Sequence, residues 1–340
     1  MKKLLNTLYV TTQGVYLHRE GETVVAAREQ KVVMRLPIHT LQSIVCFGNV
    51  LVSPFLLGLC AERGVYVSFL TENGRPLASV DGGRSGNVLL RVAQVRAADD
   101  PDWRAGISRN VVIGKVLNAR TVLQRRLRDH GADAACEYAV VRLANVVQRL
   151  RRAETTDEVR GLEGEAAAHY FGVFNSLLVA QTADFRISDR NRRPPRDPMN
   201  ALLSFLHVLL ANDCVGAVKS VGLDFQVGFL HALRSGRASL ALDLMEEFRA
   251  FFADRLALSL VNRGQIRRKD FVFSESGAVV MSETARKAVL VEWQNRKKEQ
   301  LTHPFLGEKI NVGLLPFVQA QLLARHLRGD LDAYPPFIVK

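Results

Sequence analysis

The sequence predicts an α+β fold, in which a small β-rich N-terminal domain (residues 1–90) is followed by a larger all-α domain (residues 91–340). Three observations support this prediction. Short runs of β-branched and aromatic residues, separated by turn residues, fill most of the first 80 positions. The segment 81–86, DGGRSG, has the composition of a linker, and beyond it apolar residues recur with helical spacing. At 340 residues with 48% hydrophobic content, the chain is long enough for two domains with a sizeable core.

The first domain is expected to consist of short strands around one helix. Ser53 is a suitable N-cap for that helix, Pro54 suits its first position, and Gly64 ends it. Glu72-Asn73-Gly74 is typical of a hairpin turn. The strands are expected at Leu8–Thr12, Gly14–Arg19, Thr23–Ala27, Lys31–Leu36, Ser43–Phe47, Val65–Leu70 and Pro76–Val80. The domain has no cluster of His, Asp and Glu, so we expect it to serve assembly.

The second domain is expected to be helical, with one small hairpin at residues 271–281. A capping box at Thr155–Glu158 begins one helix, and Asp197-Pro198 begins another, strongly apolar one. The other helices are expected at Asp102–His130 (as one helix or two), Asp133–Arg152, Ala250–Asn262, the residues after Ser282, and Gly313–Arg328.

Composition narrows the class of function. The net charge of +12 and the pI of about 9.9 favour a polyanionic partner, nucleic acid before membrane. The four cysteines are scattered among apolar residues, which predicts reduced core thiols in a cytoplasmic protein. No stretch approaches the roughly 18 apolar residues of a membrane span. There is no Gly-Lys-Ser/Thr loop or dinucleotide fingerprint, which argues against ATP or NAD chemistry.

The candidate functional site centres on residues 227–249. This stretch contains His231, Asp243 and Glu246, and the last two share a helix face because they are three residues apart. Glu163 lies on a different helix, between Gly161 and Gly164, and joins the same site if the two helices pack. An imidazole with carboxylates suits Mg²⁺ or Mn²⁺. The alternative is that these charges form an ordinary solvated helix face.

Two basic segments are candidates for DNA contact. Arginine presents a planar fork that matches phosphate oxygens, and so many arginines in one loop cannot all find carboxylates nearby. The alternative is a solvated loop. The candidate DNA-binding residues are Arg186, Arg190, Arg192, Arg193 and Arg196 in the first segment, and Arg267, Arg268 and Lys269 in the second.

Several longer motifs carry a resemblance to a known family. They are LEGEAAAHYF from Leu162, NRRPPRDPMNALLSF from Asn191, GFLH from Gly228, DLMEEFR from Asp243, Gln319-Ala320, LARHLR from Leu323 and YPPF from Tyr334. In this order they resemble the CRISPR-associated integrase family Cas-one, and the likeness is closest to the version of type I-C systems. Phe225 and His207 depart from the family pattern, where Pro and Tyr are usual, which leaves local packing in question.

The resemblance implies a metal-dependent DNA integrase and endonuclease of CRISPR adaptation. Its metal ligands correspond to Glu163, His231 and Glu246, with Asp243 as an acidic residue beside the metal. Spacing and the family pattern favour Glu246 over Glu247. The resemblance also implies that the second domain is catalytic, that the protein is a homodimer joined through the β-rich domains, and that two dimers flank the small partner Cas-two in a heterohexameric complex on double-stranded DNA. The alternatives are a stand-alone nuclease that repairs branched DNA and a non-catalytic DNA-binding scaffold.

Overall fold

The computed structural model describes residues 6–80, 87–191 and 194–339, and it divides into two compact units. The first unit combines the described part of Met1–Ser85 with Arg286–Glu299 and Val312–Leu314, and the second contains most of the remaining chain. The sequence analysis placed a single boundary at residue 90 and did not anticipate that residues 286–299 group with the strands. The predicted linker 81–86 lies outside the described residues.

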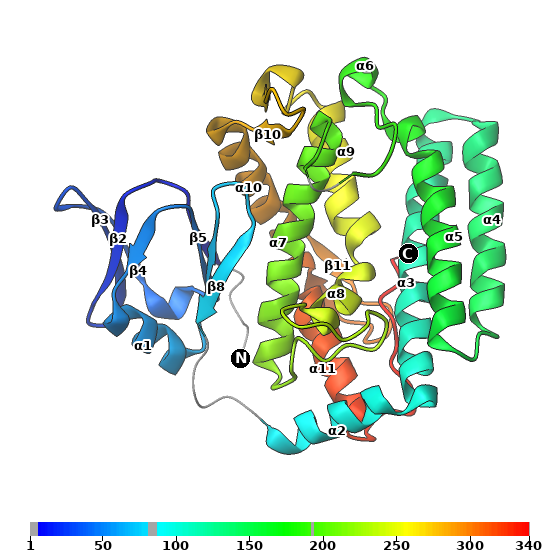
Figure 1. Ribbon diagram of the computed structural model, residues 1–340, viewed down its shortest axis with the longest axis horizontal. Helices are drawn as coiled ribbons and strands as arrows, with labels where there is room; N and C mark the ends of the chain where they lie inside the picture. The colour runs from blue at the N-terminus through cyan, green and yellow to red at the C-terminus, as the bar shows by residue number, and fades with distance from the viewer. Residues whose placement is uncertain (1–5, 81–86, 192–193, 340) are drawn as a thin grey trace. The chain divides into compact units, whose positions relative to one another are not determined.

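The first unit contains two four-stranded sheets, helix α1 (Pro54–Arg63) and most of helix α10 (Glu283–Lys298) (Figure 1). In one sheet, β1 (Thr7–Val10), β5 (Ser43–Phe47) and β7 (Tyr66–Leu70) are parallel, and β8 (Pro76–Val80) is antiparallel to β7. The other sheet has the order β4-β3-β2-β6, made of Lys31–Pro37, Thr23–Arg28, Val15–Glu20 and Val50–Val52. Leu17, Ile44, Leu56 and Val67 are fully buried in the shared core.

The helix α1 (Pro54–Arg63) begins and ends where the sequence predicts. Ser53 Oγ accepts a hydrogen bond from the Leu56 backbone N–H at 3.1 Å, and Gly64 ends the helix with a φ of +67°. Strand β6 was missed because it is three residues long and its pairing with β2 depends on tertiary contacts.

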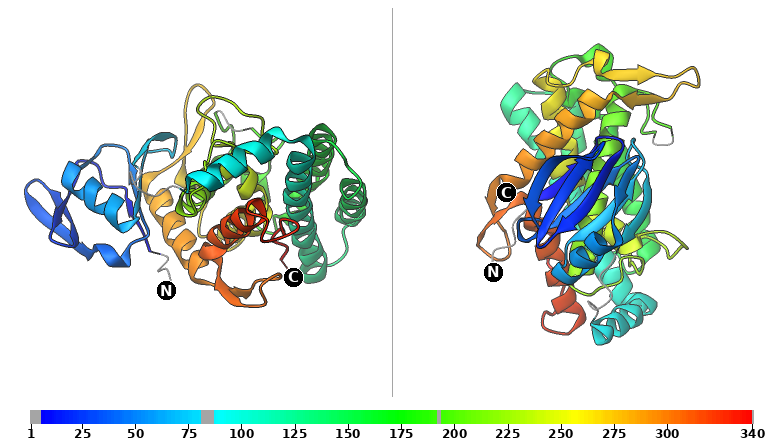
Figure 2. Two further views of the ribbon diagram at one scale, coloured as in Figure 1. Left: turned by 90° about the horizontal axis from the view of Figure 1, so that it is seen from below. Right: turned by 90° about the vertical axis from the view of Figure 1, so that its left-hand side faces the viewer.

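The second unit is built mainly of helices, which confirms the predicted fold class. The helices are α2 (Val88–Asp99), α3 (Pro101–His130), α4 (Ala134–Leu150), α5 (Thr156–Gly172), α6 (Thr182–Phe185), α7 (Pro198–Ser220), α8 (Ser239–Glu246), α9 (Arg255–Asn262) and α11 (Leu315–Leu327). Helix α10 (Glu283–Lys298) begins here and continues into the first unit. Helices α3, α4 and α5 pack side by side (Figures 1 and 2).

Helix α7 is longer than the sequence analysis expected. It continues past Leu210 to Ser220 and is long and apolar enough to cross a membrane, but 61% of its most apolar window is buried inside the protein. The buried polar residues Asn200, His207 and Asp213 lie along it. Such burial is typical of a helix in a protein core.

The four cysteines are buried and free, as predicted.

Three features of the second unit were not predicted. Helix α2 was not assigned, and a second hairpin forms from β11 (Gln300–Thr302) and β12 (Lys309–Asn311), in addition to the expected one from β9 (Phe271–Phe273) and β10 (Val279–Met281). Between α8 and α9, Arg249–Asp254 adopts a π-helical turn. Such turns occur often near functional sites, and this one follows directly after the candidate ligand Glu246.

Candidate active site

The loop that carries His231 is organised by the carboxylate of Asp243. Asp243 Oδ2 accepts hydrogen bonds from the backbone N–H groups of Phe229 (2.6 Å) and Leu230 (3.1 Å), and Oδ1 accepts one from His231 N–H (2.9 Å). A Cβ at Gly228 would lie 2.7 Å from Asp243 Oδ2, so glycine is required for this close approach. Asp243 therefore holds the loop against α8.

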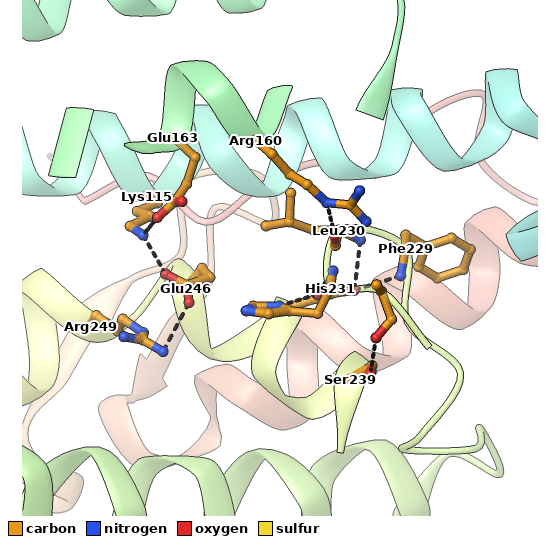
Figure 3. Close-up of polar contacts among 11 residues, drawn as sticks. Lys115, Arg160, Glu163, Phe229, Leu230, His231, Ser239, Glu246 and Arg249 are labelled. Atoms are coloured by element: carbon orange, nitrogen blue, oxygen red, sulfur yellow. Dashed lines mark hydrogen bonds and ion pairs between the residues drawn. The ribbon is translucent and has the colours of Figure 1, made fainter. Parts of the chain in front are cut away.

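The same carboxylate orients the imidazole of His231. Asp243 Oδ1 lies 2.6 Å from His231 Nδ1 (Figure 3). Because an ionised carboxylate can only accept, Nδ1 carries the proton in this contact. Since Asp243 engages Nδ1, Nε2 is the ring nitrogen available to a ligand, as in histidines that bind metals through one nitrogen and a carboxylate through the other.

Glu163 on α5 and Glu246 on α8 meet at the side chain of Lys115 on α3. Lys115 Nζ donates a hydrogen bond to Glu163 Oε1 and lies 2.7 Å from Glu246 Oε2 (Figure 3). The Lys115 side chain is only 16% exposed and that of Glu246 4%. The structure thus brings together two carboxylates that are 83 positions apart in the sequence, with one ammonium group between them.

Two cations fix the ionisation of Glu246. Arg249 lies 3.0 Å from Glu246 Oε1. Burial acts to raise the pKa of Glu246, but the charges of Arg249 and Lys115 outweigh it and lower this pKa to about 2. Glu246 is therefore a carboxylate throughout the ordinary pH range.

A pocket of about 440 Å³ opens beside these groups. It is lined by Arg160, Glu163, Leu230, His231, Ala232, Arg237 and Glu246. Arg160 donates a hydrogen bond to the Leu230 carbonyl at 2.8 Å, which ties α5 to the His231 loop (Figure 3). The pocket combines carboxylates, an imidazole and guanidinium groups, a mixture suited to an anionic substrate and a cation together.

The donor set fits a divalent ion, although its members do not surround a common point in this conformation. In the described parts of the chain, no three His, Cys, Asp or Glu side chains lie close enough to hold an ion together. The buried Glu246 Oε2 accepts no well-directed hydrogen bond and is held by the charge of Lys115. Two carboxylates around a cation, next to a free imidazole nitrogen, have the ligand chemistry of Mg²⁺ or Mn²⁺.

Glu247 points away from the pocket and binds the C-terminal segment. Its carboxylate accepts hydrogen bonds from Tyr334 Oη (2.6 Å), Gln319 Nε2 (3.0 Å) and the Phe337 backbone N–H (2.8 Å). Asn118 donates to the carbonyls of both Glu247 (2.7 Å) and Phe337 (2.9 Å). Of the two adjacent glutamates, Glu246 is the one that faces Glu163 and His231.

This arrangement predicts a pH dependence of stability. Burial raises the pKa of Glu247 to about 8, although its three hydrogen-bond donors act in the opposite direction. A carboxyl group whose pKa is higher in the folded than in the unfolded protein stabilises the fold at pH values below its unfolded-state pKa. This stabilisation is lost as the pH rises through the folded-state pKa of about 8. We expect the free energy of unfolding to fall between pH 6.5 and 8, by up to about 1.4 kcal/mol per pH unit.

Urea denaturation at pH 6.5, 7.25 and 8 measures this slope. Glu247→Gln serves as the control, because it lacks the titrating group. The buried His207, whose pKa burial lowers to about 4, gives an opposite slope only below 6.5. Equal slopes in the two proteins would contradict the prediction.

The candidate DNA-binding residues fall into two groups, and two members of the first line a second pocket. Arg186 and Arg196 are exposed and line a pocket of about 510 Å³ together with Ser188, Asp189, Asn191, Pro194 and Asp197. Arg190 is half-buried and donates to Asn200 Oδ1 at 2.7 Å and to the Asn191 carbonyl at 2.8 Å, which indicates a structural role. Arg192 and Arg193 lie outside the described residues.

The residues of the second group are exposed, but two of them also make contacts within the protein. Arg267 donates to the Gly264 carbonyl at 3.1 Å, and Arg268 stacks over the ring of Phe273 at 4.5 Å. Lys269 is exposed beside them. The two groups therefore retain exposed cations at Arg186, Arg196, Arg267, Arg268 and Lys269.

The sequence analysis missed the cations of the site: Lys115, Arg160, Arg237 and Arg249. Lys115 offered a signal, because it stands between the buried Gly114 and Val116 on a helix face that also holds the buried Asn118. A lysine in such a position needs an anionic partner inside the protein. Nothing in the sequence indicated which carboxylates would supply it.

The pocket holds carboxylates and an imidazole, and the protein that carries it is strongly basic. These features are typical of enzymes that act on phosphodiesters. Residues 8–295 match the family model described as CRISPR associated protein Cas1. The chain belongs to this family, the Cas-one family that its motifs resemble.

Curated relatives support the assignment over the full length. The chain is 52% identical to the CRISPR-associated endonuclease Cas1 1 of Chlorobaculum tepidum, with 99% of each chain covered. It is also 52% identical to the CRISPR-associated endonuclease Cas1 2 of Rhodospirillum rubrum, with 100% of each covered. At this identity the enzyme class is that of an endonuclease, as predicted.

Solved structures share the fold. A Cas1 protein from Thermotoga maritima matches with a TM-score of 0.82 at 24% identity, covering 95% of this chain and 97% of that one. A casposase bound to its integration product matches with a TM-score of 0.83 at 22% identity, covering 98% and 94%. These likenesses confirm a β-rich region followed by a helical domain.

Proposed function

We propose that this protein is the metal-dependent integrase of CRISPR adaptation, which joins the 3′-hydroxyl ends of new spacer DNA to the repeat array by transesterification and cleaves branched DNA. The observation that carries the proposal is the meeting of Glu163 and Glu246 around one cation, beside a His231 whose Nδ1 is fixed by Asp243. The 52% identity to CRISPR-associated endonucleases over the full chain supports the proposed activity.

Glu163, His231 and Glu246 are the proposed ligands of one Mg²⁺ or Mn²⁺ ion. When bound, such an ion polarises a phosphoryl oxygen and stabilises charge on the leaving oxygen. The protein's own residues prepare the site. Asp243 holds the imidazole and its loop, since both of its oxygens already accept hydrogen bonds from that loop.

The cations of the second unit provide contacts for DNA. Arg160 and Arg237 line the pocket and are available to a phosphodiester bound in it. The exposed residues Arg186, Arg196, Arg267, Arg268 and Lys269 supply further phosphate contacts, and Arg190, Arg192 and Arg193 belong to the same basic segment. Phosphate contacts of this type fix the position of the duplex without reading its sequence.

The proposed assembly is a homodimer joined through the β-rich domain (residues 1–90), with the catalytic domain at residues 91–340. Two dimers would then bind the small partner Cas-two on double-stranded DNA, in a heterohexamer in the cytoplasm. One solved structure with the same fold is a Cas6-RT-Cas1–Cas2 complex, which supports Cas-two as partner. The motifs listed above support the type I-C version.

A strand-transfer assay tests the function. It combines a short duplex with free 3′-hydroxyls, a supercoiled plasmid with a repeat, the small partner, and Mn²⁺ or Mg²⁺ against a chelator. Joining that requires the metal and the partner is the expected result. Cutting of branched junctions that is indifferent to the partner would favour a repair nuclease, and binding without joining would favour a scaffold.

A further inference from the structure

Lys115 is a positive charge between two of the three proposed ligands, Glu163 and Glu246. Its ammonium contacts Glu163 Oε1 and lies 2.7 Å from Glu246 Oε2, and these two oxygens belong to the proposed ligand set. The side chain comes from α3, whereas the two glutamates come from α5 and α8. One lysine therefore links the three helices through the carboxylates of the site (Figure 3).

The cluster needs a cation to be stable. Glu246 is nearly completely buried, and Glu163 faces it from the neighbouring helix. Two facing carboxylates of which one is buried repel each other and lose hydration unless a cation lies between them. Arg249 contacts Glu246 on its other oxygen, so Lys115 is the cation that neutralises the Glu163 side.

The position of Lys115 is incompatible with a bound divalent ion. A divalent ion held by Glu163 and Glu246 would require the carboxylate oxygens that Lys115 Nζ now contacts. Two cations on the same oxygens would repel each other strongly in a partly buried pocket. One of them must therefore leave.

We propose that Lys115 is a tethered counter-ion that neutralises Glu163 and Glu246 in the free protein, is displaced when a divalent ion binds, and then pairs with the DNA phosphodiester. This inference rests on the proposed metal site. The displaced ammonium needs another anion, and the phosphate that enters the pocket is one. DNA binding then strengthens metal binding and metal strengthens DNA binding by the same factor, because the coupling between two ligands is reciprocal.

The first measurement is Mn²⁺ affinity without DNA, by titration calorimetry or by the electron paramagnetic resonance signal of free Mn²⁺. Lys115→Met removes the competing charge and keeps the volume, so it is expected to bind Mn²⁺ roughly tenfold more tightly than the native protein. Lys115→Arg keeps the charge and is expected to bind no more tightly than the native protein. Lys219→Met is the matched control, because it makes the same substitution at a lysine that lies over the ring of Phe225 and not between the two glutamates.

The second measurement repeats the titration with a short DNA duplex present. The native protein is expected to gain Mn²⁺ affinity, whereas Lys115→Met is expected to show little or no gain. In a chelator, Lys115→Met is also expected to melt at a lower temperature than the native protein and to gain more from added Mn²⁺. If this variant folds only when Mn²⁺ is present, that result equally supports the proposal.

The outcomes distinguish the role of Lys115 from the existence of the metal site. Native-like Mn²⁺ affinity in Lys115→Met, with native-like coupling to DNA, would overturn the role of Lys115 while leaving the metal site in place. If the native protein and its Glu163→Gln variant bind Mn²⁺ equally, the proposed metal site itself is wrong, and the exchange has no basis.

Discussion

Replacing Glu163 by glutamine is expected to lower the rate of strand transfer by about 10³-fold. Glutamine keeps the size of the side chain but loses the charge that the proposed site uses to hold a cation. The variant removes only one of the two carboxylates that Lys115 contacts, and Lys115 keeps Glu246 as its partner. The fold and DNA binding are therefore expected to be retained. Single-turnover joining assays measure the rate, and a fluorescence anisotropy titration with labelled duplex measures DNA binding.

Glu165→Gln is the matched control for this variant. Glu165 lies on the same helix two residues later, but it pairs with Arg149 at 2.7 Å and with Arg142 at 3.4 Å, outside the pocket. Its strand-transfer rate is expected to remain within a few-fold of the native rate. Comparable losses in the two variants would mean that the general charge of α5 matters and that Glu163 has no special role.

Replacing Asp243 by alanine is expected to have the largest combined effect, on stability as well as on rate. The change leaves the buried N–H groups of Phe229 and Leu230 and the N–H of His231 without an acceptor, which costs roughly 3 kcal/mol of unfolding free energy. It also releases the imidazole, and loss of such an orienting carboxylate lowers the activity of metal sites by roughly 10- to 100-fold. Urea denaturation and strand-transfer assays measure the two effects.

Asp243→Asn tests whether Asp243 acts through its hydrogen bonds or through the space that its side chain fills. The amide has the same shape, but its nitrogen cannot accept the bonds that a carboxylate oxygen accepts. It is therefore expected to lose most of the stability that Asp243→Ala loses. A stable and active Asn variant would show that Asp243 acts mainly by packing.

The fold was largely predictable because its signals are local. Ser53, Pro54 and Gly64 delimit α1 through contacts within a few residues, and Thr155 and Glu158 form the capping box of α5 as expected. Strand β6 and the second hairpin were not predictable in this way. Each of their strands has only three residues, and β6 pairs with β2, which is 35 positions away in the sequence.

The acidic side of the candidate site was also predictable, and the basic side was not. Asp243 and Glu246 share a helix face through their spacing, His231 lies in the same stretch of sequence, and Glu163 was included on the condition that its helix packs against theirs. Lys115 precedes Glu163 by 48 positions, and its role depends on how α3 packs against α5 and α8. Periodicity within one helix shows that a face is buried, but it does not identify the residues of other helices that cover it.

The contacts of Glu247 have a consequence for the order in which the protein matures during synthesis. The helix that carries Glu246 is completed by hydrogen bonds from Tyr334 and Phe337, about 90 residues further along the chain. A ribosome adds roughly 5 to 20 residues per second, so α8 waits several seconds for these partners after its own synthesis. On the proposed function, the exposed Arg186 and Arg267 of the DNA-contact segments are synthesised before the helix of the proposed ligand Glu246 gains its contacts with Tyr334 and Phe337.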